Sequence, residues 1–186
     1  DVKGVFTTDP NIVSDAKKID KLAYEEMLEM ASTGAKVLQT RSVELALKNN
    51  LTLQVLSSFS NVGGTYILNE NKLIEKEIVS GVSYSENESK LTISGILDKP
   101  GISAKIFGLM SKNNINVDMI VQNISQDGIS ANMTFTVPTK DLSFAKKILQ
   151  NNGNQINYDN LSTDSDIAKI SVIGMGMMSQ TGVAEK

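Results

Sequence analysis

The sequence contains no cysteine, no histidine and no tryptophan among its 186 residues. The absence of cysteine excludes disulfide bonds and thiolate metal ligands, and the absence of histidine excludes imidazole ligands. Without either residue the chain cannot build the Ser-His or Cys-His pairs that activate a nucleophile. Its chemistry must therefore depend on carboxylates, lysines and backbone dipoles, and we expect no metal site in it.

Long basic runs and long apolar runs are also missing. The sequence has 18 Lys and Arg residues and 21 Asp and Glu residues, which gives a net charge of −3. It therefore lacks the cluster of positive charge that binds a nucleic-acid backbone. No apolar stretch is long enough for a membrane span, and the start lacks the layout of a signal peptide. We therefore expect no nucleic-acid or membrane partner and a cytoplasmic location. A hydrophobic content of 40% suffices for one ordinary core or two small ones.

The first region, up to about residue 68, predicts an α/β arrangement. Apolar residues recur at helical spacing on one face of a segment near residues 22–31, and Glu25, Glu26 and Glu29 fall largely opposite them. A second helix is expected over 41–49, followed by a strand over 51–55. This alternation is typical of the end of a layered α/β domain.

The second region, about 78–159, reads as strand, strand, helix, strand, strand, helix, strand. The alternation is clearest over 129–137, where Ile129 and every second residue after it are apolar. Helical periodicity follows Gly101 and Asp141. Two helices on one face of an antiparallel sheet predict a ferredoxin-like α+β fold, βαββαβ, with an edge free for pairing with a second copy.

The third region repeats the opening of the second. Residues 168–174 echo residues 89–95, and a glycine follows each segment where a helix is expected to begin, at Gly182 and Gly101. We interpret 163–186 as the start of a second module of the same kind. Because the chain begins with Asp1 and stops just after Gly182, we expect a piece of a longer protein.

The corner between an expected strand ending at Leu97 and the next helix gathers polar groups. The loop 98–101 supplies a carboxylate and free helix N–H groups, and the following strand carries Asp118, Gln122 and Asn123. A carboxylate attracts an ammonium and a helix N-terminus attracts a carboxylate, so the pattern predicts a pocket for a small zwitterion. Taken alone, the loop is explained equally well as a Pro-Gly turn. Gln122 and Asn123 point to opposite strand faces, so at most one lines a pocket directly.

These segments together resemble the aspartate kinases. The matching blocks are Asp-Val-Lys-Gly-Val-Phe-Thr-Thr-Asp-Pro at 1–10, Gly-Ala-Lys-Val-Leu at 34–38, Arg-Ser-Val-Glu-Leu-Ala at 41–46, Leu-Asp-Lys-Pro-Gly at 97–101, Asn-Val-Asp-Met-Ile-Val-Gln-Asn at 116–123 and Gly-Met-Gly-Met-Met-Ser at 174–179. The resemblance implies three parts: the end of an amino-acid-kinase domain at 1–68, a first ACT regulatory domain at 69–162, and the start of a second at 163–186.

The resemblance also implies a nucleotide site. The family's matching positions lie beside ATP, which is a substrate used with Mg in the full enzyme, and no cofactor is bound covalently. In this sequence those positions are Asp1, Phe6, Asn11, Lys36 and Val37. Phe6 stands where the family has Tyr, and Asn11 where it has Arg. Lys36 can also be interpreted simply as a cation near a helix C-terminus.

The resemblance places feedback amino acids, lysine and/or threonine, at interfaces between ACT domains of a homo-oligomer. Asp98 would meet the effector ammonium, and the N–H groups of the loop would meet its carboxylate. The effector-binding residues that it implies are Asp98, Gly101, Ile102, Ser103, Asp118, Gln122, Asn123, Ser125, Met177, Met178, Ser179 and Val183. The methionines can also be interpreted as strand-end packing.

The favoured function is part of an aspartate kinase, which phosphorylates L-aspartate from ATP to 4-phospho-L-aspartate at the head of lysine, threonine and methionine biosynthesis. The family's N-terminal Lys and Gly-rich phosphate-binding start, and its aspartate-binding residues, are absent here. We therefore expect no catalytic residue and no catalysis by this chain alone, only effector binding and dimerisation. The alternatives are a separate non-catalytic regulatory subunit of the beta type, or an amino-acid-binding ACT module of another enzyme.

Overall fold

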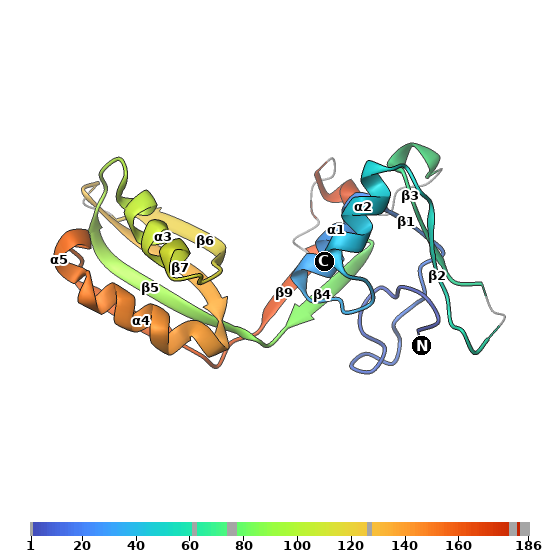
Figure 1. Cartoon of the computed structure of the whole chain (residues 1–186), viewed down its shortest axis with the longest axis horizontal. Coiled ribbons are helices and arrows are strands. Elements are labelled where there is room, and N and C mark those ends of the chain that lie inside the picture. Colours follow the sequence, from blue (N-terminus) through green and yellow to red (C-terminus); the bar gives the residue numbers. More distant parts are fainter. Residues whose placement is uncertain (1, 61–62, 74–77, 126–127, 179–181, 183–186) are drawn as a thin grey trace. The chain divides into compact units, whose positions relative to one another are not determined.

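The computed structural model describes residues 2–60, 63–73, 78–125, 128–178 and 182, and the chain falls into two compact units. Unit 1 comprises Asp1–Ser85 and Ile170–Lys186, and unit 2 comprises Glu86–Lys169. Unit 2 is thus inserted in sequence between two parts of unit 1 (Figure 1). The predicted boundaries after residues 68 and 162 separate the domains that the family resemblance implies, whereas these two units are defined by their internal contacts. The predicted boundaries therefore stay a prediction.

Unit 1 holds a three-stranded sheet with the order β1-β3-β2. β1 is parallel to β3, whereas β2 is antiparallel to it. Its elements are β1 (Lys21–Ala23), α1 (Tyr24–Thr33), α2 (Thr40–Lys48), β2 (Leu53–Val55), β3 (Thr65–Leu68) and the 3-10 turn η1 (Glu70–Lys72). The α/β character predicted for this region is confirmed, as are both helices and the strand after the second helix.

The core of unit 1 lies between its helices and its strands. Apolar side chains from β1, α1, α2 and β3 form one buried cluster, which includes Leu22, Tyr24, Met27, Met30, Val43 and Ile67. The expectation for Glu26 is wrong, because its side chain is buried, with 7% exposed. The helical pattern misplaced it because two of its three hydrogen-bond donors, Ser80 and Met175, come from distant segments.

A separate two-stranded sheet completes unit 1. It pairs β4 (Gly81–Ser85) with β9 (Lys169–Ile173), and the 3-10 helix η3 (Met175–Met178) follows β9. The sequence pattern grouped β4 with the sheet of the second region. That grouping is wrong because both edges of β5 (Glu88–Leu97), the next strand, are occupied by other partners.

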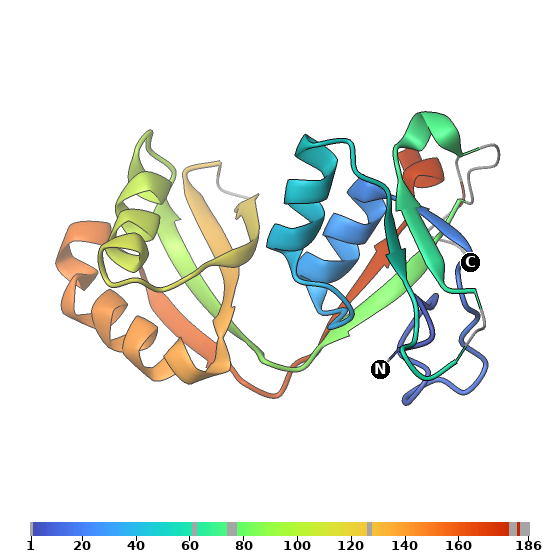
Figure 2. The same ribbon diagram turned by 45° about the vertical axis from the view of Figure 1, so that its right-hand side comes forward.

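Unit 2 is a four-stranded antiparallel sheet with the order β6-β7-β5-β8. Its elements are β5, α3 (Ile102–Lys112), β6 (Asp118–Ile124), β7 (Ser130–Pro138), the 3-10 turn η2 (Thr139–Asp141), α4 (Leu142–Asn151), the short α5 (Gly153–Ile156) and β8 (Asn160–Asp164). The helices lie together on one face of the sheet (Figure 2). The predicted βαββαβ fold is confirmed.

Alternation along β7 builds the core of unit 2. Ala131, Met133, Phe135 and Val137 are buried, and the last three pack in one cluster with residues of α3 and α4. The rings of Phe107 and Phe135 meet edge to face with centroids 5.5 Å apart. Ile129, which the alternation placed with them, is 64% exposed because it precedes the strand.

β6 is an edge strand, and all seven of its residues are exposed. Its exposed apolar side chains are Met119, Ile120, Val121 and Ile124. Within the part of the chain that the structure describes, β6 pairs with β7 alone. An apolar edge of this kind is a template for pairing with another strand.

Candidate functional site

The loop between β5 and α3 is a hydrogen-bonded turn that fixes Asp98. The Asp98 N–H donates to the carbonyl of Ile129 at 3.0 Å, and the Ile102 N–H donates to the carbonyl of Lys99 at 3.2 Å. Gly101 has φ +89°, in the left-handed region that favours glycine, and it precedes the first residue of α3. The turn therefore already engages the Ile102 N–H, which was expected, with the N–H groups of Gly101 and Ser103, to meet the effector carboxylate.

Three of the predicted effector residues lie together at this corner. The Gln122 amide nitrogen lies 3.4 Å from an oxygen of Asp98, and the hydroxyl of Ser103 lies 3.4 Å from the Gln122 amide oxygen. Both hydrogen bonds are long and the groups are solvent-accessible, so the side chains can exchange these contacts for a ligand. The arrangement offers a carboxylate, an amide and a hydroxyl, which suits an ammonium and a polar side chain.

Asn123 lies on the other face of the sheet from Gln122. Gln122 is opposite Met133, whose side chain belongs to the core, whereas Asn123 is opposite Asn132. Ser125 follows β6, and its N–H donates to the carbonyl of Ser130 at 2.8 Å. Of these residues, only Gln122 shares the contacts of Asp98.

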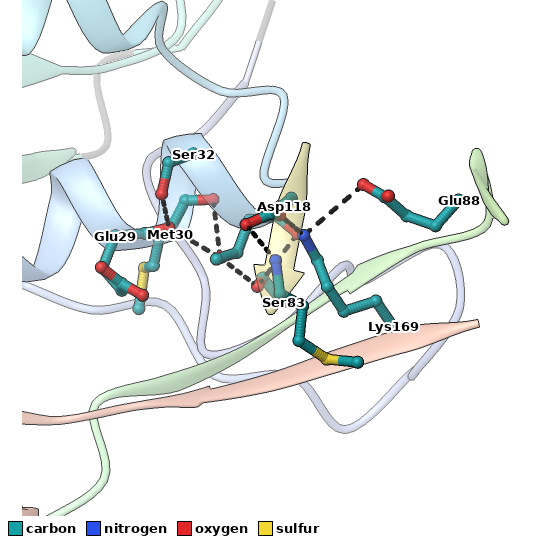
Figure 3. A network of polar contacts seen from close by, with 9 residues as sticks. Glu29, Met30, Ser32, Ser83, Glu88, Asp118 and Lys169 are labelled. Atoms are coloured by element: carbon teal, nitrogen blue, oxygen red, sulfur yellow. Dashed lines mark hydrogen bonds and ion pairs between the residues drawn. The ribbon is translucent and has the colours of Figure 1, made fainter. Parts of the chain in front are cut away.

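Asp118 is held in an ion pair that the sequence did not indicate. Its carboxylate accepts a hydrogen bond from the ammonium of Lys169 and another from the Met119 N–H at 2.8 Å, and Lys169 also lies 3.5 Å from Glu88 (Figure 3). Lys169 matches Lys90 in the repeat noted above, and Lys90 pairs with Asp164 at 3.4 Å. The shared Lys-containing motif is thus the one sequence signal for Lys169.

The pair shifts the pKa of both partners. The hydrogen bond from Lys169 lowers the pKa of Asp118 against the opposing effect of burial. Burial disfavours the charged form of Lys169, but the hydrogen bond from Lys169 to Asp118 and the charges of Asp118 and Glu88 together raise its pKa. Both groups are therefore charged across the neutral range, and an incoming ammonium would compete with Lys169 for Asp118.

The predicted nucleotide residues of unit 1 are spread over two segments. Phe6 forms an isolated antiparallel bridge with Lys18, and Asn11 donates its N–H to the side chain of Asp9 at 2.8 Å in an exposed turn. Lys36 is exposed and Val37 packs against the core just beyond the end of α1. Asp1 lies outside the described residues.

The glycine that ends α1 allows residues 34–37, which we call the nucleotide segment, to begin close to β4. A Cβ on Gly34 would lie 2.4 Å from the carbonyl oxygen of Tyr84, and the φ of Gly34 is +131°. Two observations therefore favour glycine at position 34: its left-handed φ and the close approach of the Tyr84 carbonyl oxygen.

A shallow cavity of about 320 Å³ lies in unit 1 beside the first of these segments. Its lining is mainly apolar and is made by Thr7, Thr8, Val13, Val79, Ser80, Gly81 and Val82. Sequence reasoning missed this cavity, because it forms only where residues 79–82 return to the start of the chain: the Val82 N–H donates to the Thr7 carbonyl at 2.7 Å.

The second group of predicted effector residues lies in unit 1. Met177 and Met178 belong to η3, whereas Ser179 and Val183 lie outside the described residues.

No helix in the described ranges is long and apolar enough to cross a membrane. Across the same ranges, Asp and Glu residues do not gather in a group of three or more that could hold a metal ion.

The sequence profile of the amino acid kinase family matches residues 1–57, and the profile of the ACT domain matches residues 91–152. An aspartate kinase of Pseudomonas fluorescens (strain SBW25) is 49% identical over 187 residues, which cover 100% of this chain and 45% of that protein. The chain thus spans less than half the length of the curated relatives that it matches.

Two solved structures are similar in fold as well as in sequence. E. coli aspartokinase III in complex with aspartate and ADP has a TM-score of 0.79 and 28% identity, over 100% of this chain and 41% of that one. The ligand-free regulatory subunit of aspartate kinase from Thermus thermophilus has a TM-score of 0.54 and 32% identity, over 59% of this chain and 72% of that one.

Proposed function

Because this chain belongs to the aspartate kinase family, we propose that it is part of an enzyme that transfers a phosphoryl group from ATP to L-aspartate, giving 4-phospho-L-aspartate. The observation that carries this proposal is the 49% identity over the whole chain. ATP would be the phosphoryl donor with Mg as its counterion, and the cytoplasm stays the predicted location. E. coli aspartokinase III, a structural neighbour, was solved with aspartate and ADP.

Within that enzyme, unit 1 would contact the nucleotide through Phe6, Asn11, Lys36 and Val37. Phosphoryl transfer requires several positive groups to offset the charge on the transferring phosphoryl. Of these four residues only Lys36 is cationic, and Asn11 lacks the guanidinium fork of Arg. We therefore propose that this chain alone does not catalyse the reaction.

Unit 2 would sense the end products of the pathway. The polar corner formed by Asp98, Gln122 and Ser103 suits an α-amino acid, because the carboxylate of Asp98 could bind the ammonium group of the ligand. Another aspartokinase III structure contains lysine and aspartate. We propose L-lysine and/or L-threonine as the effector, and a preference of the effector for one arrangement of the ACT domains as the basis of feedback control.

A homo-oligomer formed through the ACT domains follows from the same reasoning. The apolar edge of β6, which pairs only with β7 among the residues that the structure describes, supports it, because pairing with a second strand stabilises such an edge. Asp118, Met177, Met178, Ser179 and Val183 would complete the effector site with residues of a second ACT domain, and this assignment stays a proposal.

A separate regulatory subunit is the second candidate. The match to the Thermus regulatory subunit favours it, since that protein is covered over 72% of its length. The match reaches only 59% of this chain, however, and residues 1–57 match the amino acid kinase family. A kinase segment of this kind has no evident use in a purely regulatory subunit, so the first proposal is preferred over both this one and an ACT module of another enzyme.

Calorimetric titration of the chain with L-threonine and L-lysine, each with and without the other, tests the sensing function. We expect saturable heat for at least one of them. The variant Asp98→Ala removes a charged hydrogen-bond partner and should weaken binding by about 1.5–3 kcal/mol, which is roughly tenfold or more. Asp166→Ala, in the same unit and also exposed, is the matched control and should bind normally. Unchanged affinity in the Asp98 variant would remove it from the site.

A further inference from the structure

Glu26 is a buried carboxylate that the proposed chemistry does not use. It lies in the first turn of α1, and 7% of the residue is exposed. No lysine or arginine forms an ion pair with it in the part of the chain that the structure describes. A buried charge without an opposite charge requires several hydrogen bonds to offset its lost hydration.

Three donors supply those bonds, and they come from three separate segments of unit 1. One oxygen of Glu26 accepts the Ala23 N–H at 3.2 Å, at the start of its own helix. The other oxygen accepts the Ser80 hydroxyl and the Met175 N–H, the latter at 3.2 Å. The carboxylate therefore joins α1 to the segment before β4 and to the first residue of η3.

The same helix is fixed to β4 at its other end. The hydroxyl of Thr33 lies within hydrogen-bond distance of the hydroxyl of Ser83, which also donates to the Thr33 carbonyl at 3.3 Å. Beyond Thr33, Gly34 passes close to Tyr84 and leads to Lys36. α1 is thus hydrogen-bonded at its start to Ser80 and to Met175 of η3, and at its end to Ser83 of β4, just before the segment that leads to Lys36.

The backbone near Met175 leaves little room for adjustment. A Cβ on Gly174 would lie 2.1 Å from the carbonyl oxygen of Ile78 and 2.7 Å from the Cα of Val79. The residues just before Ser80 and the residue just before Met175 are therefore in close backbone contact, and Glu26 accepts a hydrogen bond from Ser80 and another from Met175. A change in the place of η3 must be accommodated at Glu26.

We propose that Glu26 is a positioning residue for η3: its carboxylate fixes the place of Met177 and Met178 and links this segment, through α1, to Lys36 and Val37. Glu26 itself touches neither effector nor nucleotide. The positioning of η3 depends on the contacts above, whereas its consequence for effector binding rests on the proposed function.

The test compares Glu26→Gln with Glu25→Gln, which changes an exposed carboxylate one position away on the same helix. Glutamine keeps one acceptor oxygen, but this neutral oxygen accepts hydrogen bonds more weakly than a carboxylate does, and the NH₂ group cannot accept any. The Met175 N–H therefore has a weaker acceptor or none, whichever way the amide is turned. Hydrogen exchange at the Met175 amide, followed by NMR on the whole chain, reports the link directly. Calorimetric affinity for L-threonine and L-lysine reports its consequence.

We expect exchange at the Met175 amide to become at least tenfold faster in Glu26→Gln, while amides of β7 in unit 2 keep their rates. Effector affinity should fall about tenfold in the same variant, and Glu25→Gln should match the parent in both measurements. If Glu26→Gln does not fold, Ser80→Ala removes one partner while leaving the carboxylate, and it should show the same changes at smaller size.

Unchanged exchange at Met175 in a folded variant would overturn the positioning role. Faster exchange with unchanged effector affinity would overturn the link to the effector segment. If the parent chain binds neither amino acid, the proposed sensing function fails, and the exchange comparison alone then decides whether Glu26 positions η3.

Discussion

The ammonium of Lys169 donates a hydrogen bond to the carboxylate of Asp118, and this joins the last residue of unit 2 to the start of its edge strand. The Lys169 side chain is 12% exposed and that of Asp118 is 53% exposed. The ion pair therefore has one partner largely withdrawn from water: water screens the attraction less than on an open surface, but the lost hydration of Lys169 offsets part of that gain.

The Asp118–Lys169 pair predicts a pH dependence of stability. The folded pKa of Asp118 is lowered, so its contribution is present above the ordinary carboxyl value and is lost as the pH falls through the folded pKa. The folded pKa of Lys169 is raised, so its contribution is present below the ordinary lysine value and is lost as the pH rises through the folded pKa. Asp118→Asn should cost about 0.5–1 kcal/mol near neutral pH, a modest value because Asp118 is half exposed.

Urea denaturation of the parent and of Asp118→Asn at several pH values checks this prediction. The difference in the free energy of unfolding should be largest near neutral pH and should shrink below about pH 4 and above about pH 10.5. Asp166→Asn, at an exposed carboxylate for which the described residues provide no ion pair, is the control. A difference between Asp118→Asn and the parent that stays constant across the range would show that the ion pair is not its source.

The edge of β6 predicts the effect of a charge on self-association. Ile120 is 53% exposed in the middle of this strand, and a lysine there would oppose pairing with another strand. We expect Ile120→Lys to weaken dimerisation at least tenfold in analytical ultracentrifugation. Phe144→Lys, which replaces a 50% exposed side chain on α4, should dimerise as the parent does. Equal dimerisation of the two variants would place the interface elsewhere.

Two glycines of unit 2 should respond to alanine in opposite ways. Gly95 has φ +69°, and a Cβ there would lie 2.0 Å from a carboxylate oxygen of Asp159, so Gly95→Ala should cost about 1–3 kcal/mol. Gly108 lies inside α3 with open space around its Cα, so Gly108→Ala should add about 1 kcal/mol. Chemical denaturation of both variants gives the two signs, and a stabilising Gly95→Ala would contradict the geometry.

Thr65 should be intolerant of a change that keeps its shape. Its hydroxyl is buried, accepts the Val5 N–H at 2.8 Å and donates to the Ile19 carbonyl at 2.5 Å. Thr65→Val leaves both backbone groups without this partner and should cost about 1–3 kcal/mol in thermal or urea unfolding. The same change at the exposed Thr52 is the control and should have little effect. Equal stability of the two variants would show that water replaces the hydroxyl.

Local patterns in the sequence were sufficient for most elements. The alternation from Ala131 to Val137 identified the central strand, because successive side chains of a strand point to opposite faces of the sheet. When one face is buried, every second residue is apolar. The helical spacing after Gly101 identified α3 for the equivalent reason. The corner of Asp98, Ser103 and Gln122 was also predicted, because the polar groups of the 98–101 loop and of the strand after the next helix stand out in the sequence. The sheet order was not: β7 lies between β5, which leads into the loop, and β6, which carries Gln122.

Contacts between distant segments left no local pattern. Glu26 resembles any solvent-facing carboxylate of an amphipathic helix until Ser80 and Met175 provide its donors. Lys169 likewise becomes informative only once the fold places Asp118 within reach. The pairing of β4 with β9 is of the same kind, because strand order depends on which edges remain free after nearer strands have paired.

The pairing of β4 with β9 also constrains the order in which the chain folds. If unit 2 were unfolded, this pairing would close a loop of roughly 85 residues at an entropic cost of about 4 kcal/mol. Folding of unit 2 aligns Lys90 with Asp164, near the two places where the chain enters and leaves it. Only short connections then separate β4 from β9. We therefore expect unit 2 to fold first and, by bringing its two ends together, to lower the entropic cost of pairing β4 with β9.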